Sequence, residues 1–528
     1  MSNHAYESAA ALRPSSNGPI PISTLSERFS LAPASAEDAA TLNDLSILGV
    51  SVDSADTAPG ELFVGLPGFT AHGARFAAEA VASGAVAVLT DADGARIVHE
   101  SAPGTPVLVH DDPRAVVGPL SAEAYHHPAR GLITTAVTGT NGKTTTAYFL
   151  DAILSAHVGG CMVAGTVELR VGEHSVESPR TTVEAPVLQR MMALAVEDKV
   201  GAASLEASSH AIVLHRLDGI VVDVAGFTNL QRDHLDFHKT MEGYLEAKAQ
   251  LFTPEHARRG VVCVDDQWGA ALAGQASVEV DRVRAYPGDT PADWWVSDAA
   301  VSLTDSATTF TLHGPDGEKI EASCPLPGLV NVQNAALALV MAIRAGVPAA
   351  TAATALAGAH NIPGRMQRIS QRDGRRGLCI VDFAHTPEAM ELALKAVRPI
   401  TPGRLIVVFG SDGDRDQGKR PMLGEVCARL ADVLVVTDEN PRSEDPQLIR
   451  NAILEGVRGV RPDLTDVEEI TTWRGDAVRR GVELCEPDDT VIVTGKGHEP
   501  FLEMAGEFIR YNDAPVMAEA VEEKWGRA

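Results

Sequence analysis

Short apolar runs typical of strands alternate along the chain with stretches in which the apolar residues have helical spacing. This alternation predicts an α/β protein. Residues 132–137 (LITTAV) are apolar and β-branched, which is typical of a buried strand. Residues 147–154 (AYFLDAIL) have the apolar spacing of a helix that ends at Gly159 and Gly160. The glycine-rich residues 137–146 (VTGTNGKTTT) join the two, and we expect the chain to be organised around this strand, loop and helix.

The loop has the residues that wrap a phosphate chain. Backbone N–H groups and a helix N-terminus attract the anion, Lys143 can reach the terminal phosphates, and Thr144 can hold Mg²⁺. Val137 stands where the strict pattern has its first glycine. A tight turn with a surface lysine is the alternative, but the flanking strand and helix favour nucleotide binding.

The residues before this loop predict a tail and one small domain. Residues 1 to about 20 include PSSNGP and are typical of a mobile tail. Residues 21–130 alternate short strands, such as 85–89 and 106–109, with helical runs, which indicates a small α/β domain. The pattern alone does not reveal its ligand.

Polar motifs follow strand-like stretches in the central region, residues 131–362. Residues 204–210 (SLEASSH) and 227–236 (FTNLQRDHLD) are placed to lie at the carboxyl edge of a parallel sheet, where ligands gather. Glu206 would suit a Mg²⁺ ion, although a single Glu or His in such a place is more often structural. Lys248 (YLEAK) has the pattern of a solvated helix lysine.

The C-terminal region, residues 363–528, predicts a doubly wound sheet. Residues 405–409, 433–436 and 491–493 are continuous apolar strands of the buried parallel type. Each leads into a polar block, namely residues 412–420, 438–442 and 495–499. Three such blocks would meet along one edge of the sheet. The blocks contain four basic residues, Arg415, Lys419, Arg420 and Arg442. Such a cluster in an acidic protein favours a ligand crevice over three solvated turns.

Composition narrows the function classes. The 528 residues are enough for about three domains, and no uninterrupted apolar run suits a membrane helix. We find no signal segment at the start and expect a cytoplasmic protein. The net charge of -27 argues against a general nucleic-acid binder, so an anionic substrate must meet local basic clusters. The six cysteines are scattered without a C-x-x-C pair, which favours reduced structural thiols over disulfides or a zinc site.

The motifs, taken in order, resemble those of the Mur ligase family. The matching stretches are GTNGKTT (139–145), EASSH (206–210), NLQRDH (229–234), LPGLVNVQN (326–334) and PGRM (363–366). Four more stretches are similar to members that add the third amino acid to the peptidoglycan precursor: VDFAHTP (381–387), GDRDQGKRPM (413–422), NPR (440–442) and GKGHE (495–499). The resemblance covers nearly everything after the tail.

The resemblance implies three domains and one reaction. Residues 21–130 would bind the uridine nucleotide, residues 131–362 ATP, and residues 363–528 the incoming amino acid. The activity implied is an ATP-dependent amide ligase that extends UDP-N-acetylmuramoyl-L-alanyl-D-glutamate through an acyl phosphate, with ATP and Mg²⁺ as cofactors. It would act in the cytoplasm as a monomer, with no nucleic acid and no membrane span.

The resemblance also implies which residues form the site, because each site residue of the family has a matching position in this sequence. ATP contacts would fall on Gly139, Thr140, Asn141, Gly142, Lys143, Thr144, Thr145, Asn334 and Arg365. The UDP-muramoyl-peptide contacts would fall on Val52, Ser54, Phe69, Thr70, Ala71, Thr181, Thr182, Ser208 and Arg216. Leu214 stands where relatives often have a substrate-binding Gln, so we do not predict a substrate contact there. The catalytic residues implied are Lys143, Glu206, His234 and Lys248.

Lys248 matches a lysine that similar enzymes carry as a carbamate. An ammonium group cannot ligate Mg²⁺, whereas a CO₂-modified lysine is a carboxylate-like anion on a long stem. The resemblance therefore implies that Lys248 is N6-carboxylysine. The implied metal ligands are Thr144, Glu206, His234 and carbamylated Lys248.

The amino acid that is added would contact Arg415, Glu439, Asn440, Pro441, Arg442, Gly495 and Glu499. Relatives that use meso-diaminopimelate have an Asp-Asn-Pro-Arg block whose Arg binds the second carboxylate. This chain keeps Arg442 but has Glu439 in place of the Asp, and Asp412 and Pro500 also depart from that pattern. Arg442 favours meso-diaminopimelate, whereas the added acidic groups would suit L-lysine or L-ornithine.

Two other functions stay open. A folylpolyglutamate synthetase shares the central ATPase, but the N-terminal domain and the NPR block speak against it. A P-loop ATPase or regulator without ligase activity would release phosphate from ATP alone. A ligase would require both a carboxylate substrate and an amine.

Overall fold

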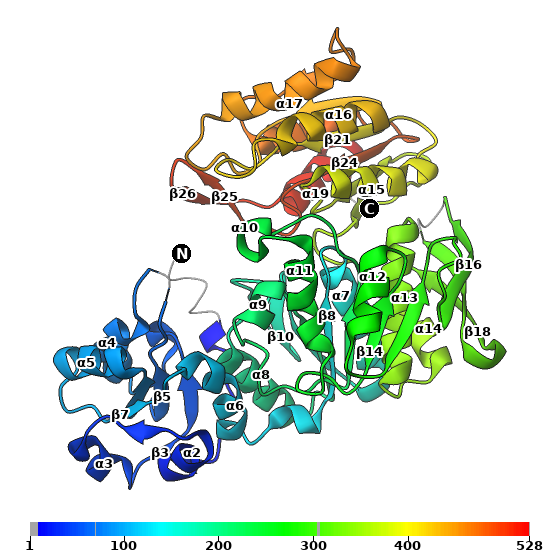
Figure 1. Cartoon of the computed structure of the whole chain (residues 1–528). Helices are drawn as coiled ribbons and strands as arrows, with labels where there is room; N and C mark the ends of the chain where they lie inside the picture. The colour runs from blue at the N-terminus through cyan, green and yellow to red at the C-terminus, as the bar shows by residue number, and fades with distance from the viewer. Residues whose placement is uncertain (1–8, 69, 304–306, 527–528) are drawn as a thin grey trace. The chain divides into compact units, whose positions relative to one another are not determined.

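The structure, a computed structural model, describes residues 9–68, 70–303 and 307–526. It forms two compact units (Figure 1). The first contains the chain up to residue 295 together with 314–318 and 334–355. The second contains 296–313, 319–333 and the chain from 356 onward.

A small, mostly parallel sheet opens the first unit. Its strand order is β2-β7-β6-β5-β4, and only β2 runs antiparallel to its neighbour. The strands are β2 (Ala32–Pro33), β4 (Gly49–Ser51), β5 (Glu61–Val64), β6 (Ala87–Thr90) and β7 (Val107–Val109). The helices are α2 (Ile22–Phe29), α3 (Ala36–Leu42), α4 (Ala77–Ala82), α5 (Ala92–Ser101) and α6 (Pro113–Ala124).

The second sheet of the first unit is built around β8 (Ile133–Thr138). Its order runs β11-β10-β9-β12-β8-β13-β14-β15. The strands from β9 to β15 in this order are parallel to one another, and the β10–β11 hairpin joins β9 with β10 antiparallel to it. The other strands are β9 (Cys161–Ala164), β10 (Glu168–Val171), β11 (His174–Glu177), β12 (Ala202–Glu206), β13 (Val224–Phe227), β14 (Gly260–Cys263) and β15 (Val280–Arg284). The helices include α7 (Lys143–Val158), α8 (Ala185–Glu197), α9 (Ser209–Val213), α10 (Leu235–His238), α11 (Met241–Ala249) and α12 (Gln267–Gln275).

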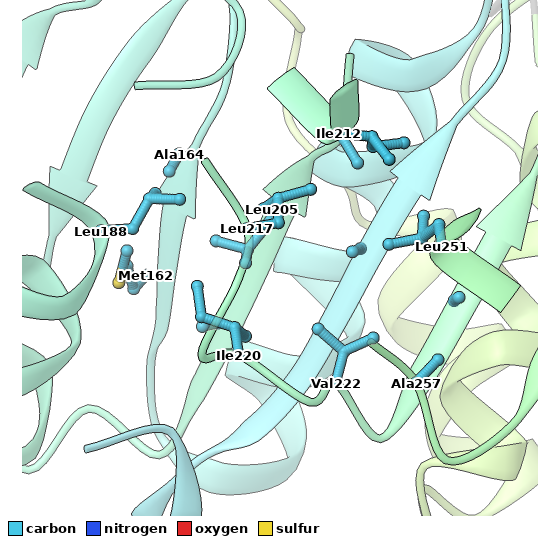
Figure 2. Packing of buried hydrophobic residues seen from close by; sticks show 14 of the residues in the cluster. Met162, Ala164, Leu188, Leu205, Ile212, Leu217, Ile220, Val222, Leu251 and Ala257 are labelled. Atoms are coloured by element: carbon cyan, nitrogen blue, oxygen red, sulfur yellow. The ribbon is translucent and has the colours of Figure 1, made fainter. Parts of the chain in front are cut away.

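One apolar cluster supports this sheet from one side. Leu188 of α8 lies beside Met162 of β9 in this cluster, and Leu205 of β12 lies beside Leu217 (Figure 2). Because these side chains are buried together, the carboxyl ends of β8, β12 and β13 are held in one row. The loops that follow those strands are therefore neighbours.

The second unit has a six-stranded sheet of order β19-β20-β24-β21-β22-β23, in which only the edge strand β19 is antiparallel. The strands are β19 (Gln367–Ser370), β20 (Leu378–Val381), β21 (Leu405–Phe409), β22 (Val433–Val436), β23 (Val467–Glu469) and β24 (Thr490–Val493). The helices are α15 (Pro387–Val397), α16 (Lys419–Leu430), α17 (Pro446–Val460), α18 (Arg474–Leu484) and α19 (Asp513–Trp525). The hairpin β25 (Phe501–Met504) and β26 (Glu507–Arg510) follows β24.

Strand residues of this sheet are buried on both faces. Ile406 and Val408 pack with α18 and α19, whereas Val407 and Phe409 are fully buried on the other face. The predicted α/β class and the doubly wound C-terminal sheet are confirmed.

The chain from Ala9 onward packs against the first unit, whereas the sequence predicted a mobile tail to about residue 20. Leu12 is fully buried within the cluster of Figure 2. Arg190 of α8 donates to the carbonyl oxygens of Leu12 (3.1 Å) and Ala9 (2.8 Å). The prediction of a tail is wrong for these residues because a buried arginine, distant in sequence, ties their backbone down. Residues 1–8 lie outside the described part of the chain.

Two further features bear on the class of protein. Within the described residues, no helix is long and apolar enough to cross a membrane. The six cysteines are buried with free thiols.

Candidate active site

The phosphate loop joins β8 to α7 as the sequence predicts. Gly139 and Gly142 have φ values of +143° and +89°, and α7 begins at Lys143. A Cβ on Gly142 would lie 2.2 Å from Oδ1 of Asn334, and one on Gly139 would lie 1.8 Å from Oγ1 of Thr228. Both positions therefore require glycine on conformational and on steric grounds.

Side chains after β13 fix the shape of the loop. The backbone N–H of Thr140 donates to the carbonyl of Asn229 (2.9 Å), and that of Asn141 to the Asn229 side chain (3.1 Å). The Asn141 amide donates to Gln231 (2.8 Å). The two strand-end motifs are thus brought together, as their position after parallel strands predicted.

Two residues at the start of α7 face the ligand side of the loop. Lys143 Nζ donates to the carbonyls of Gly139 and Thr140, both at 2.9 Å. Thr144 Oγ1 donates to Oε2 of Glu206 at 3.0 Å. An ammonium group and the helix N-terminus thereby lie together, which is the chemistry that attracts phosphate oxygens.

Glu206 is buried at the end of β12 in a frame of hydroxyl and amide donors. The Thr166 hydroxyl donates to Oε2 (3.0 Å) and its N–H to Oε1 (2.8 Å). Gly165 lies so close that a Cβ would approach Oε1 to 2.2 Å. Sequence reasoning missed Thr166, because no motif marks the loop after β9.

The peptide-binding candidates gather beside Glu206. Thr182 Oγ1 donates to the Glu206 carbonyl (2.7 Å) and accepts from the Ser208 N–H (3.0 Å). The Thr181 hydroxyl is 3.1 Å from that of Thr166. Arg216 donates to the Thr182 carbonyl (3.2 Å). Hydrogen bonds therefore link all four candidates to Glu206 or to its partner Thr166, directly or through Thr182.

Lys248 is buried, not solvated, although its position on α11 suggested a surface lysine. Nζ donates to the carbonyl of Gly139 (3.0 Å) and lies 4.4 Å from the centre of the Tyr244 ring. Burial and the nearby charge of Lys143 hold the pKa of Lys248 well below its usual value, with Asp233 opposing them. This shift favours the uncharged amine, which is the form that reacts with CO₂.

His234 lies next to this group at the start of α10, with φ at +54°. Its ring is 4.9 Å from that of His210. Burial lowers the pKa of His234, Asp233 opposes the shift, and the charges of His210, Lys143 and Lys248 add to it. A neutral imidazole is the form that can ligate a metal.

A cavity of about 220 Å³ in the first unit is lined both by residues that follow β4 and by residues around the start of α8. Val52, Asp53 and Ala71 line it, which places two of the predicted UDP contacts in its wall. The Ser54 hydroxyl donates to Glu79 (2.9 Å). The other two predicted contacts are Thr70, which is exposed, and Phe69, which lies outside the described residues.

In the second unit, the three polar blocks meet at one edge of the sheet. Asn440 donates to Asp412 (3.0 Å) and Glu499 (3.2 Å), and Lys496 donates to Asn440 (2.8 Å) and Glu499 (3.0 Å). Lys496, fully buried, joins two of the blocks. The sequence signal for it was its place in the GKGHE stretch.

Arg442 and Glu439 flank this network. Arg442 has φ at +55° and lies 3.7 Å from Asp412 and 3.5 Å from Glu503. Its buried Nε has no hydrogen-bond partner among the described residues. Burial, and next the charge of Asp412, raise the pKa of Glu439 to about 8.

Not every residue of the predicted basic cluster faces the crevice. Arg420 is buried and donates two bonds to Glu444, at 2.9 and 2.8 Å, so it supports the loop. Lys419 donates to the His385 carbonyl (3.1 Å), and Arg415 is exposed. Arg365 stacks over the Phe383 ring at 4.3 Å.

Arg474 stabilises the loops at this edge of the sheet through hydrogen bonds. Its guanidinium binds both oxygens of Asp513, at 2.9 and 2.8 Å, and both groups are fully buried. It also donates to the carbonyls of Asp438 (2.9 Å), the first residue of one polar block, and Thr494 (2.8 Å), the residue before another. Sequence reasoning missed it, because Arg474 lies outside every motif.

Three family models match consecutive parts of the chain. They are described as Mur ligase family, catalytic domain (residues 46–125), Mur ligase middle domain (137–342), and Mur ligase, glutamate ligase domain (364–497). The three-domain α/β fold expected from the sequence is thereby confirmed.

Similar proteins extend over most of the chain. A UDP-N-acetylmuramoyl-L-alanyl-D-glutamate–2,6-diaminopimelate ligase of Streptomyces coelicolor is 43% identical over 91% of this chain and 93% of its own length. A UDP-N-acetylmuramyl-tripeptide synthetase of Leifsonia xyli is 42% identical over 95% of this chain and 96% of its own. A solved structure of a UDP-N-acetylmuramoyl-L-alanyl-D-glutamate–2,6-diaminopimelate ligase has a TM-score of 0.65 and 31% identity, covering 92% of this chain and 96% of that one.

Proposed function

Because the chain belongs to the Mur ligase family, we propose that it joins meso-diaminopimelate to UDP-N-acetylmuramoyl-L-alanyl-D-glutamate in peptidoglycan synthesis. The chain is an ATP-dependent acid–amino-acid ligase. The substrates proposed here are those in the name of the Streptomyces relative, which matches at 43% identity across nearly its whole length. That match is the observation on which the proposal rests.

The first step would join the substrate carboxylate to the γ-phosphorus of ATP. An O–P bond forms, the bond from the γ-phosphorus to the β-γ bridging oxygen breaks, and ADP leaves with that electron pair. Two anions must approach each other, so the protein has to neutralise charge and align the groups. Lys143 and the N-terminus of α7 support this role, because they place a cation and backbone N–H groups at the loop.

We propose that Thr144, Glu206, His234 and carbamylated Lys248 hold Mg²⁺, which would spread the phosphate charge. Their chemistry fits: one hydroxyl and one buried carboxylate already lie 3.0 Å apart, and His234 has a lowered pKa. Among the described residues, no three Asp, Glu, His or Cys side chains are clustered for a metal. A carbamate on Lys248 would supply the missing anion.

The modification itself is simple chemistry. The neutral amine of Lys248 attacks the carbon of CO₂, a C–N bond forms, and one proton leaves to water. The product bears one negative charge. The carbamate would place an anion beside the Lys143 ammonium, whose charge disfavours a second ammonium at Lys248.

The second step would join the incoming amine to the acyl phosphate. The neutral amine attacks the acyl carbon and a C–N bond forms. The nitrogen then gives up one proton to water, the bond from the acyl carbon to the phosphate oxygen breaks, and phosphate leaves with that electron pair.

We propose that Arg442 binds the distal carboxylate of meso-diaminopimelate, because its buried Nε makes no hydrogen bond among the described residues and its contacts to Asp412 (3.7 Å) and Glu503 (3.5 Å) are long. Asp412, Glu439 and Glu499 offer acceptors for the distal ammonium. L-lysine would satisfy these acids but has no distal carboxylate to pair with Arg442.

The test is ligation with purified protein, ATP and UDP-N-acetylmuramoyl-L-alanyl-D-glutamate, with the amino acid varied. Mass spectrometry should detect the tripeptide product with meso-diaminopimelate, and phosphate release should require all three substrates. Phosphate release from ATP alone would favour a simple ATPase. Product formed only from a folate and glutamate would favour a folylpolyglutamate synthetase.

A further inference from the structure

Residues 9–13 (AAALR) form a short segment that packs into the first unit, far in sequence from every motif. Leu12 is fully buried and Ala9 is 3% exposed, both within the apolar cluster of Figure 2. Ala9 also lines the cavity of about 220 Å³ whose wall holds predicted contacts of the uridine nucleotide. The segment is therefore part of the wall of the proposed substrate site, although neither its pattern nor the family resemblance gave it a role.

Arg13, the last residue of this segment, joins Asp56, which follows β4, and Glu61, the first residue of β5. Its Nη2 donates to Oδ1 of Asp56 at 3.0 Å, and its Nη1 forms an ion pair with Oε1 of Glu61. The carboxylates of Asp56 and Glu61 are buried, 6% and 4% exposed. Burial lowers the pKa of Arg13, but the charges of Glu61 and Asp56 outweigh it and raise that pKa above its usual value. The guanidinium therefore stays charged and holds both acids.

A second arginine, Arg190 of α8, binds the other oxygen of Asp56. Its Nη1 donates to Oδ2 of Asp56 at 2.9 Å, and its remaining nitrogens donate to the carbonyls of Leu12 and Ala9. Both oxygens of Asp56 therefore have a guanidinium partner, one from the N-terminal segment and one from α8. A single buried network thus links residues 9–13, the N-terminal sheet and α8.

This network affects the charge of the cavity wall. The charged residues that line the cavity are three acids and two arginines: Asp53, Asp56, Glu184, Arg114 and Arg180. Burial raises the pKa of Asp53, the Ala55 N–H opposes this shift, and the charge of Asp56 adds to it, so the two carboxylates repel each other. An anionic substrate would meet the same repulsion. Arg13 and Arg190 compensate the charge of Asp56 and so reduce it.

We propose that Arg13 is a positioning residue for the UDP-linked substrate, because it fixes Asp56 and compensates its charge. Among the described residues, Asp56 lines the cavity and Arg13 does not, so Arg13 acts through Asp56 and not by contact with the substrate. Without Arg13, Oδ1 of Asp56 and Oε1 of Glu61 would lose a cation while both acids stay buried, which is costly. The inference rests on the proposed function, because it takes a UDP-linked anion as the ligand.

The test measures kcat and the KM values for UDP-N-acetylmuramoyl-L-alanyl-D-glutamate and ATP in the ligation assay. Arg13→Ala should raise the KM for the UDP-linked substrate about 10-fold and leave kcat and the KM for ATP unchanged, because only the cavity wall loses its compensating charge. Arg13→Lys should raise that KM only about 3-fold, since an ammonium keeps the charge but does not match two carboxylates as a guanidinium does. Arg28→Ala removes an exposed arginine that pairs with Glu123 in the same unit, and as the matched control it should change neither KM.

A purely structural role for Arg13 predicts a different result. Fewer active molecules would lower kcat and leave both KM values as in the wild type, and that result would overturn the inference. An equal rise of both KM values would also overturn it, because the damage would extend beyond the cavity. If Arg13→Ala does not fold, Arg13→Lys decides, and a wild-type KM for the UDP-linked substrate in that variant contradicts the inference.

The wild type separates this inference from the proposed function. In each of the outcomes that overturn the role of Arg13, the wild type still ligates, so the proposed function stands. A wild type that does not use the UDP-linked substrate would contradict the proposed function itself, and the role of Arg13 with it.

Discussion

The amino group of Lys248 lies 3.0 Å from the carbonyl oxygen of Gly139, which ties α11 to the phosphate loop. Lys143 donates to that same carbonyl at 2.9 Å, so two lysines converge on one backbone oxygen. Two ammonium groups in this setting repel each other, and burial removes the water that would screen them. The geometry therefore favours an uncharged Lys248 and, after reaction with CO₂, an anionic one.

Replacing Lys248 by alanine should abolish most turnover while the fold is kept. The reason is the loss of the anion that completes the proposed metal site, and not the loss of packing alone. Small carboxylates such as formate or acetate should restore part of the activity, because they can occupy the vacated position. The measurement is the ligation rate of the variant with and without added carboxylate.

Lys395→Ala is the matched control, because Lys395 is an exposed helix lysine paired with Glu391. It should leave the rate unchanged. Near-normal activity of Lys248→Ala at low bicarbonate would contradict the carbamate.

Lys143→Ala should lower ATP-dependent turnover by about three orders of magnitude, since it removes the cation at the reacting phosphates. Binding of the UDP-muramoyl-dipeptide should be retained, because its proposed contacts lie elsewhere in the first unit. Rates and substrate affinity are measured on the same preparation. Turnover that survives the substitution would mean that this loop is not the catalytic one.

The raised pKa of Glu439 predicts how the stability of the fold depends on pH. Its pKa is raised to about 8 in the fold, from 4.5 in the unfolded chain. The folded state therefore keeps a proton that the unfolded state releases, and this contribution to stability is lost as the pH rises through 8. Between pH 5 and 9, the melting temperature of the wild type should fall more steeply than that of Glu439→Gln. Calorimetry on both proteins checks this, and parallel pH curves would refute the raised pKa.

The local pattern of apolar residues and glycines was enough to predict many of the strands and helices. The sequence predicted a strand over 132–137 and a helix ending at Gly159, and the structure has β8 (Ile133–Thr138) and α7 ending at Val158. Residues 405–409 and 433–436 were predicted as strands and are β21 and β22. These elements could be predicted because periodicity and glycine punctuation act over a few residues.

Burial at long range could not be predicted in the same way. Lys248 has the periodicity of a solvated residue, and only the phosphate loop, 109 residues earlier, explains why it is buried. Leu12 was expected in a mobile tail, but Arg190, 178 residues away, holds its carbonyl. Arg114 and Glu184 pair across 70 residues, a contact that no local pattern indicates.

The central claim is that this ligase selects meso-diaminopimelate through Arg442. The most direct measurement is the ratio of kcat/KM for meso-diaminopimelate to that for L-lysine, in the wild type and in Arg442→Ala. We predict a ratio well above one in the wild type. In the variant it should fall about 10- to 100-fold, because a carboxylate loses its guanidinium partner while lysine loses none. A preference for L-lysine that Arg442→Ala leaves unchanged would contradict the account.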